Sequence, residues 1–129
     1  MLWPLWWNRP CVQVILTLSA TSQSHPRTLL ADTGAGSRAG PFELILDEAD
    51  CLRCGGLPRL SIILRGAYTG IFQIYDIDVQ VPALGFAQRL RAVGVPSVPR
   101  RFDGIAGFRF LNRFTYGNFG DPGQFGLEC

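Results

Sequence analysis

Short stretches of alternating hydrophobic and polar residues run along most of this chain, a pattern typical of β-strands with one buried face. In the first stretch Val12, Val14, Leu16 and Leu18 share a face. A later stretch, 70–81, has one face made of Ile71, Tyr75, Ile77, Val79 and Val81. In the stretch 86–95, Arg89 and Arg91 face away from Leu90 and Ala92. The pattern predicts strands at 12–19, 27–31, 42–46, 59–64, 70–81 and 86–95, a short apolar segment at 105–107 and a last strand within 115–128.

Helical signals are confined to two short segments. Segment 47–56 (DEADCLRCGG) opens with acidic residues and closes with glycines, which suits one or two turns of helix. Phe108, Leu111 and Phe114 have helical spacing and are expected in the core. With 15 Gly and 9 Pro in 129 residues, the sequence predicts one all-β domain, a barrel or a sandwich.

Charge and hydropathy exclude several classes of function. Twelve arginines and no lysine give a net charge of only +2, too weak to indicate nucleic-acid binding. The apolar opening MLWPLWW is far shorter than a membrane span and lacks the features of a signal peptide. We expect a Trp-rich arm at 1–9 and the domain at 10–129, with cytoplasm as the compartment. The arm with Trp3, Trp6 and Trp7 could cover an apolar surface, touch a membrane or come from a misplaced start codon.

The cysteines leave several alternatives open. Cys51 and Cys54 have the spacing of a metal or redox pair, but Cys11 and Cys129 lie near the ends. The one histidine, His25, precedes a proline in a polar turn at 20–26 and is expected at the surface. Two buried thiols or a local disulfide explain the pair better than a metal or redox site. We therefore expect no cofactor and no metal.

Asp32 poses the main question, because an apolar strand runs directly into this carboxylate. The motif ADTGA at 31–35 contains it, and DGIAG follows at 103–107, with the glycine-flanked hairpin RGAYTG (65–70) between them. In this order and spacing the motifs resemble those of the retropepsin-like aspartic proteases. The resemblance covers about residues 10–126, although only the two motifs match tightly. It implies a closed or partly closed β-barrel of the retropepsin type with one or two short helices, active as a homodimer.

The resemblance also implies a role for each motif residue. Asp32 would be the catalytic carboxylate, Thr33 would hydrogen-bond across the dimer axis, and Gly34 and Ala35 would leave room for water and substrate. Support beneath this loop would come from Ile105, Ala106 and Gly107. The flap candidates are Gly66, Ala67, Tyr68, Thr69 and Gly70. Asp103 is expected to be a turn residue and not a second catalytic acid.

The implied reaction is hydrolysis of a peptide bond by two carboxylates that share one proton, one acting as base and the other as acid. The chain has one Asp-Thr-Gly and no room for a second lobe, so the second Asp32 would come from a second copy. The partners implied are therefore the chain itself and a peptide or protein substrate.

The sequence departs from the retroviral pattern at two positions, so functions other than proteolysis stay open. Gly36 stands where an acidic residue is usual, and Phe108 follows the apolar-apolar-Gly element where Arg is frequent, with Arg109 one residue later. The retroviral pairing of those side chains is thus lost or rebuilt. Besides the aspartic endopeptidase, a dimeric peptide-binding or assembly module with weak catalysis remains, and so does a metal or redox protein that uses the cysteine pair.

Overall fold

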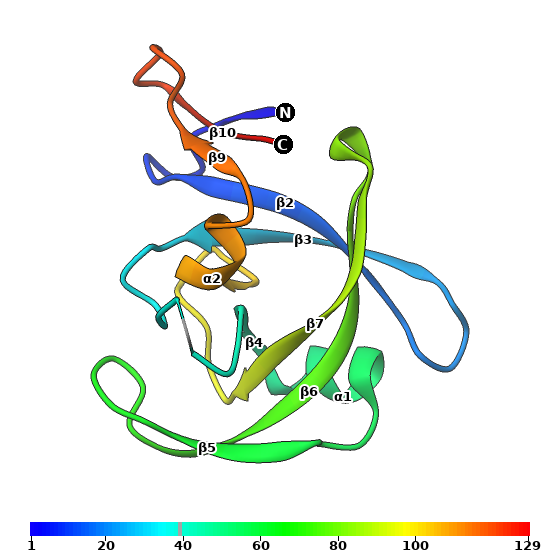
Figure 1. Cartoon of the computed structure of the whole chain (residues 1–129). Helices are drawn as coiled ribbons and strands as arrows, with labels where there is room; N and C mark the ends of the chain where they lie inside the picture. The colour runs from blue at the N-terminus through cyan, green and yellow to red at the C-terminus, as the bar shows by residue number, and fades with distance from the viewer. Residues whose placement is uncertain (39) are drawn as a thin grey trace.

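The chain is mostly β-structure with two short α-helices, and a computed structural model describes residues 1–38 and 40–129 (Figure 1). The strands are β1 (Leu2–Pro4), β2 (Cys11–Thr17), β3 (Ser24–Ala31), β4 (Leu44–Asp47), β5 (Leu60–Leu64), β6 (Gly70–Val81), β7 (Phe86–Val95), β8 (Gly104–Ala106), β9 (Thr115–Gly117) and β10 (Gln124–Glu128). The helices are α1 (Glu48–Gly55), α2 (Phe108–Leu111) and a 3₁₀ turn at Pro82–Leu84.

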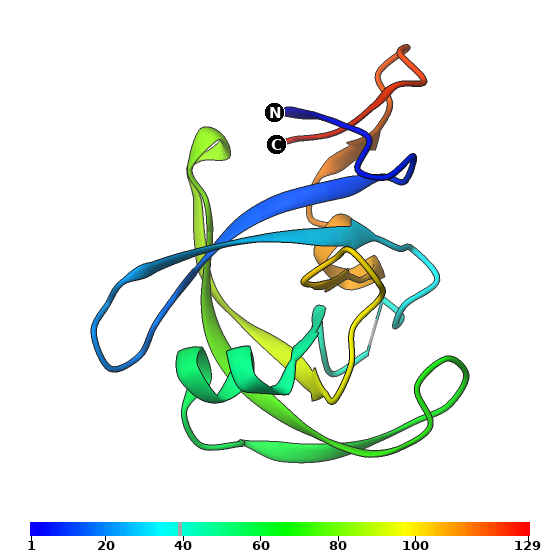
Figure 2. The same ribbon diagram turned by 180° about the vertical axis from the view of Figure 1, so that it is seen from behind.

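Six strands close into a barrel. Their order is β2-β3-β8-β4-β7-β6, and β2 closes the ring by pairing with β6 at Ile15↔Gln80 and Leu16↔Val79. Strand β5 pairs only with β6 and extends the β5–β6 hairpin beyond the ring (Figures 1 and 2). The alternating faces predicted for the strands supply the core, so Val12, Val14 and Leu16 are buried as expected.

A second, three-stranded sheet joins the two ends of the chain in the order β1-β10-β9. The N-terminal amine donates to the carbonyl of Leu127 at 2.8 Å, and the N–H of Leu127 donates to the carbonyl of Met1 at 2.9 Å. Trp3 is buried, whereas Trp6 and Trp7 are exposed. The first residues of the expected arm are therefore a strand of this sheet, and the two termini lie side by side (Figure 1).

Both predicted helices form, and each has a local cause. Asp47 caps α1 by accepting a hydrogen bond from the N–H of Ala49 at 2.8 Å. Helix α2 spans only four residues. Phe110 and Leu111 are buried, whereas Phe108 and Phe114, also expected in the core, are half-buried. The Phe110 ring contacts Phe86 and Phe114 with centroids 5.9 and 5.4 Å apart, which holds α2 against the barrel.

Three sequence expectations need correction. Strand β3 begins at Ser24, so the turn is shorter than the expected 20–26. The strand tolerates Pro26, which has no N–H to donate, because β8 pairs with residues 29–31 and leaves the edge of β3 at Pro26 free. His25 is only partly at the surface, because its side chain is 26 % exposed and lies 3.7 Å from Asp50. Ile71 is exposed, although it was expected on the buried face of β6. Helix α1 covers this face at Tyr75 and Ile77, but the β5–β6 hairpin extends past the helix at Ile71.

Candidate functional site

The structure brings the two sequence motifs together. Strands β3 and β8 pair in parallel, with Leu30 opposite Ile105 and Ala31 opposite Ala106. The ladder continues one residue further, because the N–H of Asp32 donates to the carbonyl of Ala106 at 3.0 Å. Asp32 is thus fixed at the end of a buried two-strand ladder, although its motif and DGIAG are far apart in the sequence.

The Asp32 carboxylate is held by its own loop. The N–H of Gly34 donates to Oδ1 at 2.8 Å, and the N–H of Ala35 donates to the Asp32 carbonyl at 3.2 Å. A Cβ on residue 34 would lie 3.1 Å from Oδ1, so glycine keeps this approach open. Asp32 itself is half-buried, whereas Thr33 and Gly34 are exposed at the loop tip. The carboxylate is therefore oriented but still reachable.

Gly107 supports the candidate active-site loop (residues 32–36) from below. Its N–H donates to the carbonyl of Glu43 at 2.9 Å, and the N–H of Phe108 donates to the carbonyl of Ala35 at 2.9 Å. A Cβ at position 107 would lie 2.7 Å from the Ala35 oxygen, closer than real side chains come. Ile105 and Ala106 are buried beside it. The residues expected beneath the loop do lie there.

A cavity of about 150 Å³ opens in front of Asp32 and is roofed by the β5–β6 hairpin. In Figures 1 and 2 the loop after β3 and the tip of this hairpin lie on the same side of the molecule. The cavity is lined by Asp32, Gly34, Ala35, Gly36, Phe42, Ile45, Leu64, Arg65, Ala67, Tyr68 and Ile105. Of the flap candidates, Ala67 and Tyr68 border the cavity, and Gly66, Thr69 and Gly70 shape the turn around them.

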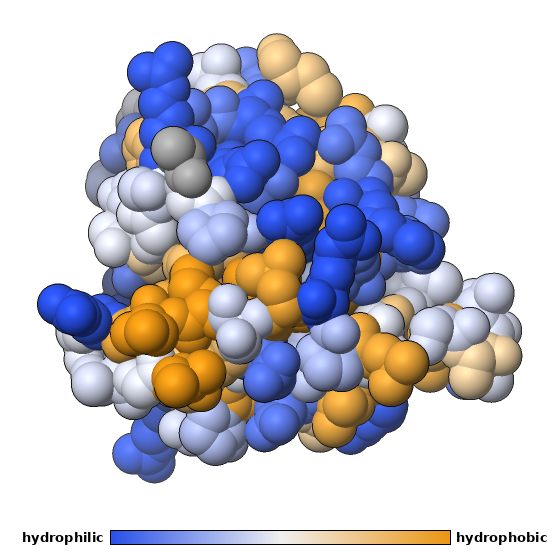
Figure 3. Space-filling model, turned by 60° about the horizontal axis from the view of Figure 1, so that its bottom comes forward, coloured by the Kyte–Doolittle hydropathy of each residue, from blue (hydrophilic) through white to orange (hydrophobic). Residues whose placement is uncertain are grey.

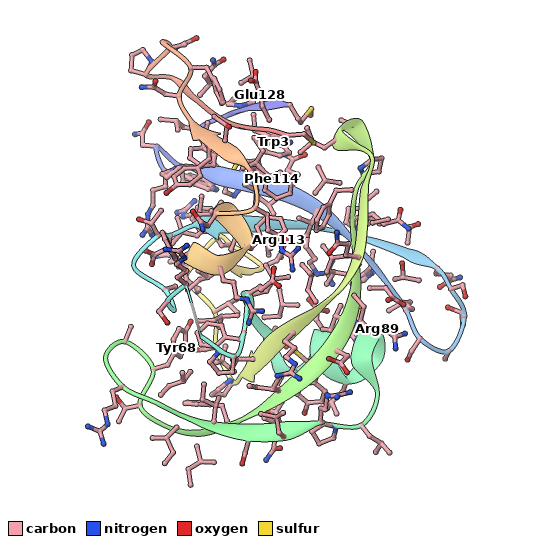
Figure 4. All side chains as sticks on the ribbon, viewed as in Figure 1. Trp3, Tyr68, Arg89, Arg113, Phe114 and Glu128 are labelled. Carbon is pink, nitrogen blue, oxygen red and sulfur yellow. The ribbon has the colours of Figure 1, made fainter. Side chains whose placement is uncertain are left out.

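Tyr68 is the large side chain of the hairpin tip (Figure 4). Its ring meets that of Phe72 edge to face, with centroids 6.4 Å apart, and burial raises the pKa of its hydroxyl. The Thr69 hydroxyl donates to the Gly66 carbonyl at 3.1 Å and closes the turn. On the outer face of the hairpin Ile63 and Ile71 are cross-strand partners and exposed. Figure 3, which brings this side forward, shows a hydrophobic patch there.

Sequence reasoning missed four residues of the cavity wall: Phe42, Ile45, Leu64 and Arg65. The three apolar ones looked like ordinary strand residues, and only the tertiary structure brings them to the cavity at Asp32. Arg65 directly precedes Gly66, the first of the flap candidates, and this position in the sequence could have indicated that it borders the cavity. It brings a positive charge to the cavity rim without an ion pair among the described residues.

The departures from the retroviral pattern have structural counterparts. Gly36 has φ of +79°, and a Cβ there would lie 3.2 Å from the Phe42 ring, so an acidic side chain would be strained and crowded. Arg109 instead donates to the Gly40 carbonyl at 2.6 Å. Arg113, at the end of α2, forms an ion pair with the buried Glu43 at 2.6 Å. The loop is therefore braced by other residues.

Asp103 does not reach the Asp32 cavity. Its Oδ2 accepts a hydrogen bond from the N–H of Thr28 at 2.9 Å, and its N–H donates to the Thr28 carbonyl at 2.9 Å. Asp103 is exposed and closes the loop before β8. This agrees with the expected turn role.

The cysteine pair lies on α1, away from the cavity lining. Cys51 and Cys54 are buried free thiols, so the local disulfide considered for them is not formed. Across residues 1–38 and 40–129, no three His, Cys, Asp or Glu side chains gather as metal ligands would. Nor is either helix within those residues long and apolar enough to cross a membrane. Nearby, Arg27 donates two hydrogen bonds to the buried Asp50, at 2.7 and 2.9 Å.

Comparison with protein-family models, with curated proteins and with solved structures found no match to this chain.

Proposed function

We propose that this chain is an aspartic endopeptidase of the retropepsin type that works as a homodimer. The observation that carries the proposal is the β3–β8 ladder, which joins ADTGA to DGIAG and places Asp32 at its end. The cavity in front of Asp32, roofed by a hairpin with Tyr68 at its tip, could take one residue of a peptide held between loop and flap. The resemblance of the motifs supplies the reaction.

In this proposal two Asp32 carboxylates, one from each subunit, lie close together and share a proton. The ionised carboxylate takes a proton from water as the water attacks the peptide carbonyl, and the protonated one gives its proton to the leaving nitrogen. The Gly34 N–H, 2.8 Å from Oδ1, orients the carboxylate and stabilises its charge. Closure of the hairpin would exclude bulk water during the reaction.

The dimer is required because one chain supplies a single Asp-Thr-Gly. Two features favour association on this side. Thr33 is exposed at the loop tip, where it can meet its counterpart in the second copy. Trp6 and Trp7 are also exposed, and the carbonyl of Pro10, three residues after Trp7, accepts a hydrogen bond from the N–H of Ala31 at 3.0 Å. An apolar surface next to the active-site loop is a natural contact for a second copy.

The test is cleavage of a mixed peptide library from acid to neutral pH, read by mass spectrometry with a chelator present. Wild type should cut and Asp32→Asn should not, because Asn fills the same space without supplying a base or an acid. Sedimentation velocity should show both proteins as dimers. Equal cutting by both would exclude Asp32 as the catalytic group. No cutting by a confirmed dimer would favour the peptide-binding module instead.

A further inference from the structure

A second hollow, the arginine groove, lies on the outer side of the barrel between α2 and the β6–β7 ladder. It has a volume of about 510 Å³ and shares no lining residue with the Asp32 cavity. In Figure 4 Arg113 lies beside α2 and Arg89 beside β6 and β7, which mark its borders. The groove is lined by Glu43, Arg59, Asp76, Arg89, Arg91, Arg109 and Arg113. Five guanidiniums (+5) and two carboxylates (−2) leave a formal charge of +3.

Ion pairs neutralise only some of these arginines. Arg59 pairs with Asp76 at 3.0 Å, and Arg113 pairs with Glu43 at 2.6 Å. Arg89 pairs at 3.1 Å with Asp78, which is outside the lining. Each pair occupies a carboxylate that would otherwise be free to neutralise the remaining arginines.

Arg91 and Arg109 are left with uncompensated charge. Arg91 lies opposite Asp76 in the ladder, but Arg59 occupies that carboxylate. Within the described part of the chain the Arg91 guanidinium has no ion pair within 4.0 Å. Among residues 1–38 and 40–129, Arg109 has no ion pair, and its guanidinium donates to the neutral carbonyl of Gly40 at 2.6 Å. Two free guanidiniums at the border of a hollow favour an anionic ligand.

We propose that the arginine groove binds an acidic segment of a polypeptide. Its guanidiniums come from β7, from α2 and the turn after it, and from the segment before β5, so the charge is spread along the groove, as carboxylates along an extended chain are. Nucleic acid is a poorer fit, because Asp76 and Glu43 lie among the arginines and the net charge of the chain is only +2. That the ligand is a polypeptide rests on the proposed function.

The groove is coupled to the active-site loop by residues 40–43. Phe42 lines the Asp32 cavity, whereas its neighbour Glu43 lines the groove. Arg109, from the groove side, holds the Gly40 carbonyl. An acidic segment in the groove would therefore tether a substrate whose cleavage site occupies the cavity, and would raise its effective concentration there.

The test is binding of a short fluorescent peptide of alternating Glu and Gly, measured by anisotropy. It uses the full chain carrying Asp32→Asn, so the result does not depend on cleavage. Arg91→Gln should weaken binding by about fivefold or more, as expected for loss of a charged contact at a partly exposed site. Arg53→Gln, on the exposed face of α1, removes the same charge and is the matched control. Added salt should weaken the wild-type affinity.

Several outcomes would overturn the proposal. These are absence of binding, equal binding of a Gln–Gly peptide, or equal losses in Arg91→Gln and Arg53→Gln. Tripolyphosphate that bound at least as tightly, with the same dependence on Arg91, would make this a site for small anions instead. If the Glu–Gly peptide binds as expected while wild type cuts nothing, the groove assignment stands and the endopeptidase proposal fails.

Discussion

The guanidinium of Arg113 donates two hydrogen bonds to the carboxylate of Glu43, at 2.6 and 2.7 Å. The Glu43 side chain is only 5 % exposed. Its backbone carbonyl accepts a hydrogen bond from the N–H of Gly107, which lies directly beneath the loop of residues 32–36. The pair therefore ties the end of α2 to the segment that supports Asp32.

Breaking this pair from the arginine side should destabilise the fold. Arg113→Leu leaves a buried carboxylate without its partner, and we expect a loss of about 2–3 kcal/mol in the free energy of unfolding, measured with urea. The double variant Glu43→Leu/Arg113→Leu should recover much of the lost free energy of unfolding, because no unpaired carboxylate is then buried. Arg89→Leu is the control: it removes an arginine from an exposed ion pair with Asp78 and should hardly change the free energy of unfolding. Equal shifts in Arg113→Leu and Arg89→Leu would contradict this role for Glu43.

Gly107→Ala should disturb the loop of residues 32–36, because the new Cβ would lie 2.7 Å from the Ala35 carbonyl oxygen. Forcing extra volume into a packed site costs about 1–3 kcal/mol. We expect a lower unfolding midpoint together with a lower rate of peptide cleavage. Gly123→Ala is the control, since its Cβ would meet only the flexible side chain of Asp121, at 3.3 Å. A Gly107→Ala protein as stable as Gly123→Ala would show that the loop yields without cost.

Tyr68 should matter through its ring rather than its hydroxyl. Among the described residues its hydroxyl has no hydrogen-bond partner, and its ring borders the cavity and contacts Phe72. Tyr68→Phe should cleave peptides much as wild type does, whereas Tyr68→Ala should raise KM about tenfold by removing the roof over the substrate. The measurement is steady-state kinetics on one peptide chosen from the library. If both variants lose activity alike, the hydroxyl has a function of its own.

The four thiols should differ sharply in reactivity. Cys11, Cys51 and Cys54 are buried and Cys129 is exposed. The thiolate is the reactive form, and burial raises the pKa of the Cys51 thiol to about 12 and also raises those of Cys11 and Cys54. A thiol reagent at pH 8 should therefore modify one cysteine rapidly in the native protein and all four in urea. Fast modification of a second cysteine in the native protein would contradict the packing of α1 or β2.

The raised pKa of Cys51 also predicts alkaline destabilisation. The folded protein holds this proton up to a pKa of about 12, whereas the unfolded chain releases it near the ordinary value of 9.0. The stabilisation is thus complete below pH 9 and is lost as the pH rises from 9 toward 12. Urea denaturation across this range should show the decline, and Cys51→Ala should have a flatter profile. Identical slopes in the two proteins would mean that other groups cause it.

Much of the secondary structure could be predicted from sequence, because it depends on neighbouring residues. The alternation in 70–81 predicted β6 with its observed bounds, and the acidic start and glycine end of 47–56 predicted α1. The predictions were wrong where contacts with distant residues set the exposure of a side chain or the extent of a strand. Ile71 has the same parity as Tyr75, but only Tyr75 is covered by α1. His25 follows turn-forming residues, yet pairing of β3 with β2 extends the strand through it.

The candidate site divides in the same way. The sequence by itself determined the candidate site residues: one Asp-Thr-Gly, one apolar-apolar-Gly element and a glycine-flanked hairpin, each recognisable because a few adjacent residues define it. Only the tertiary structure decided that Asp32 and Ala106 are hydrogen-bonded and that Tyr68 roofs the cavity. It also decided that Arg113 pairs with Glu43 and that Arg91 has no ion pair among the residues that the structure describes. These relationships join residues distant in sequence, and barrel closure with its register sets them rather than any local preference.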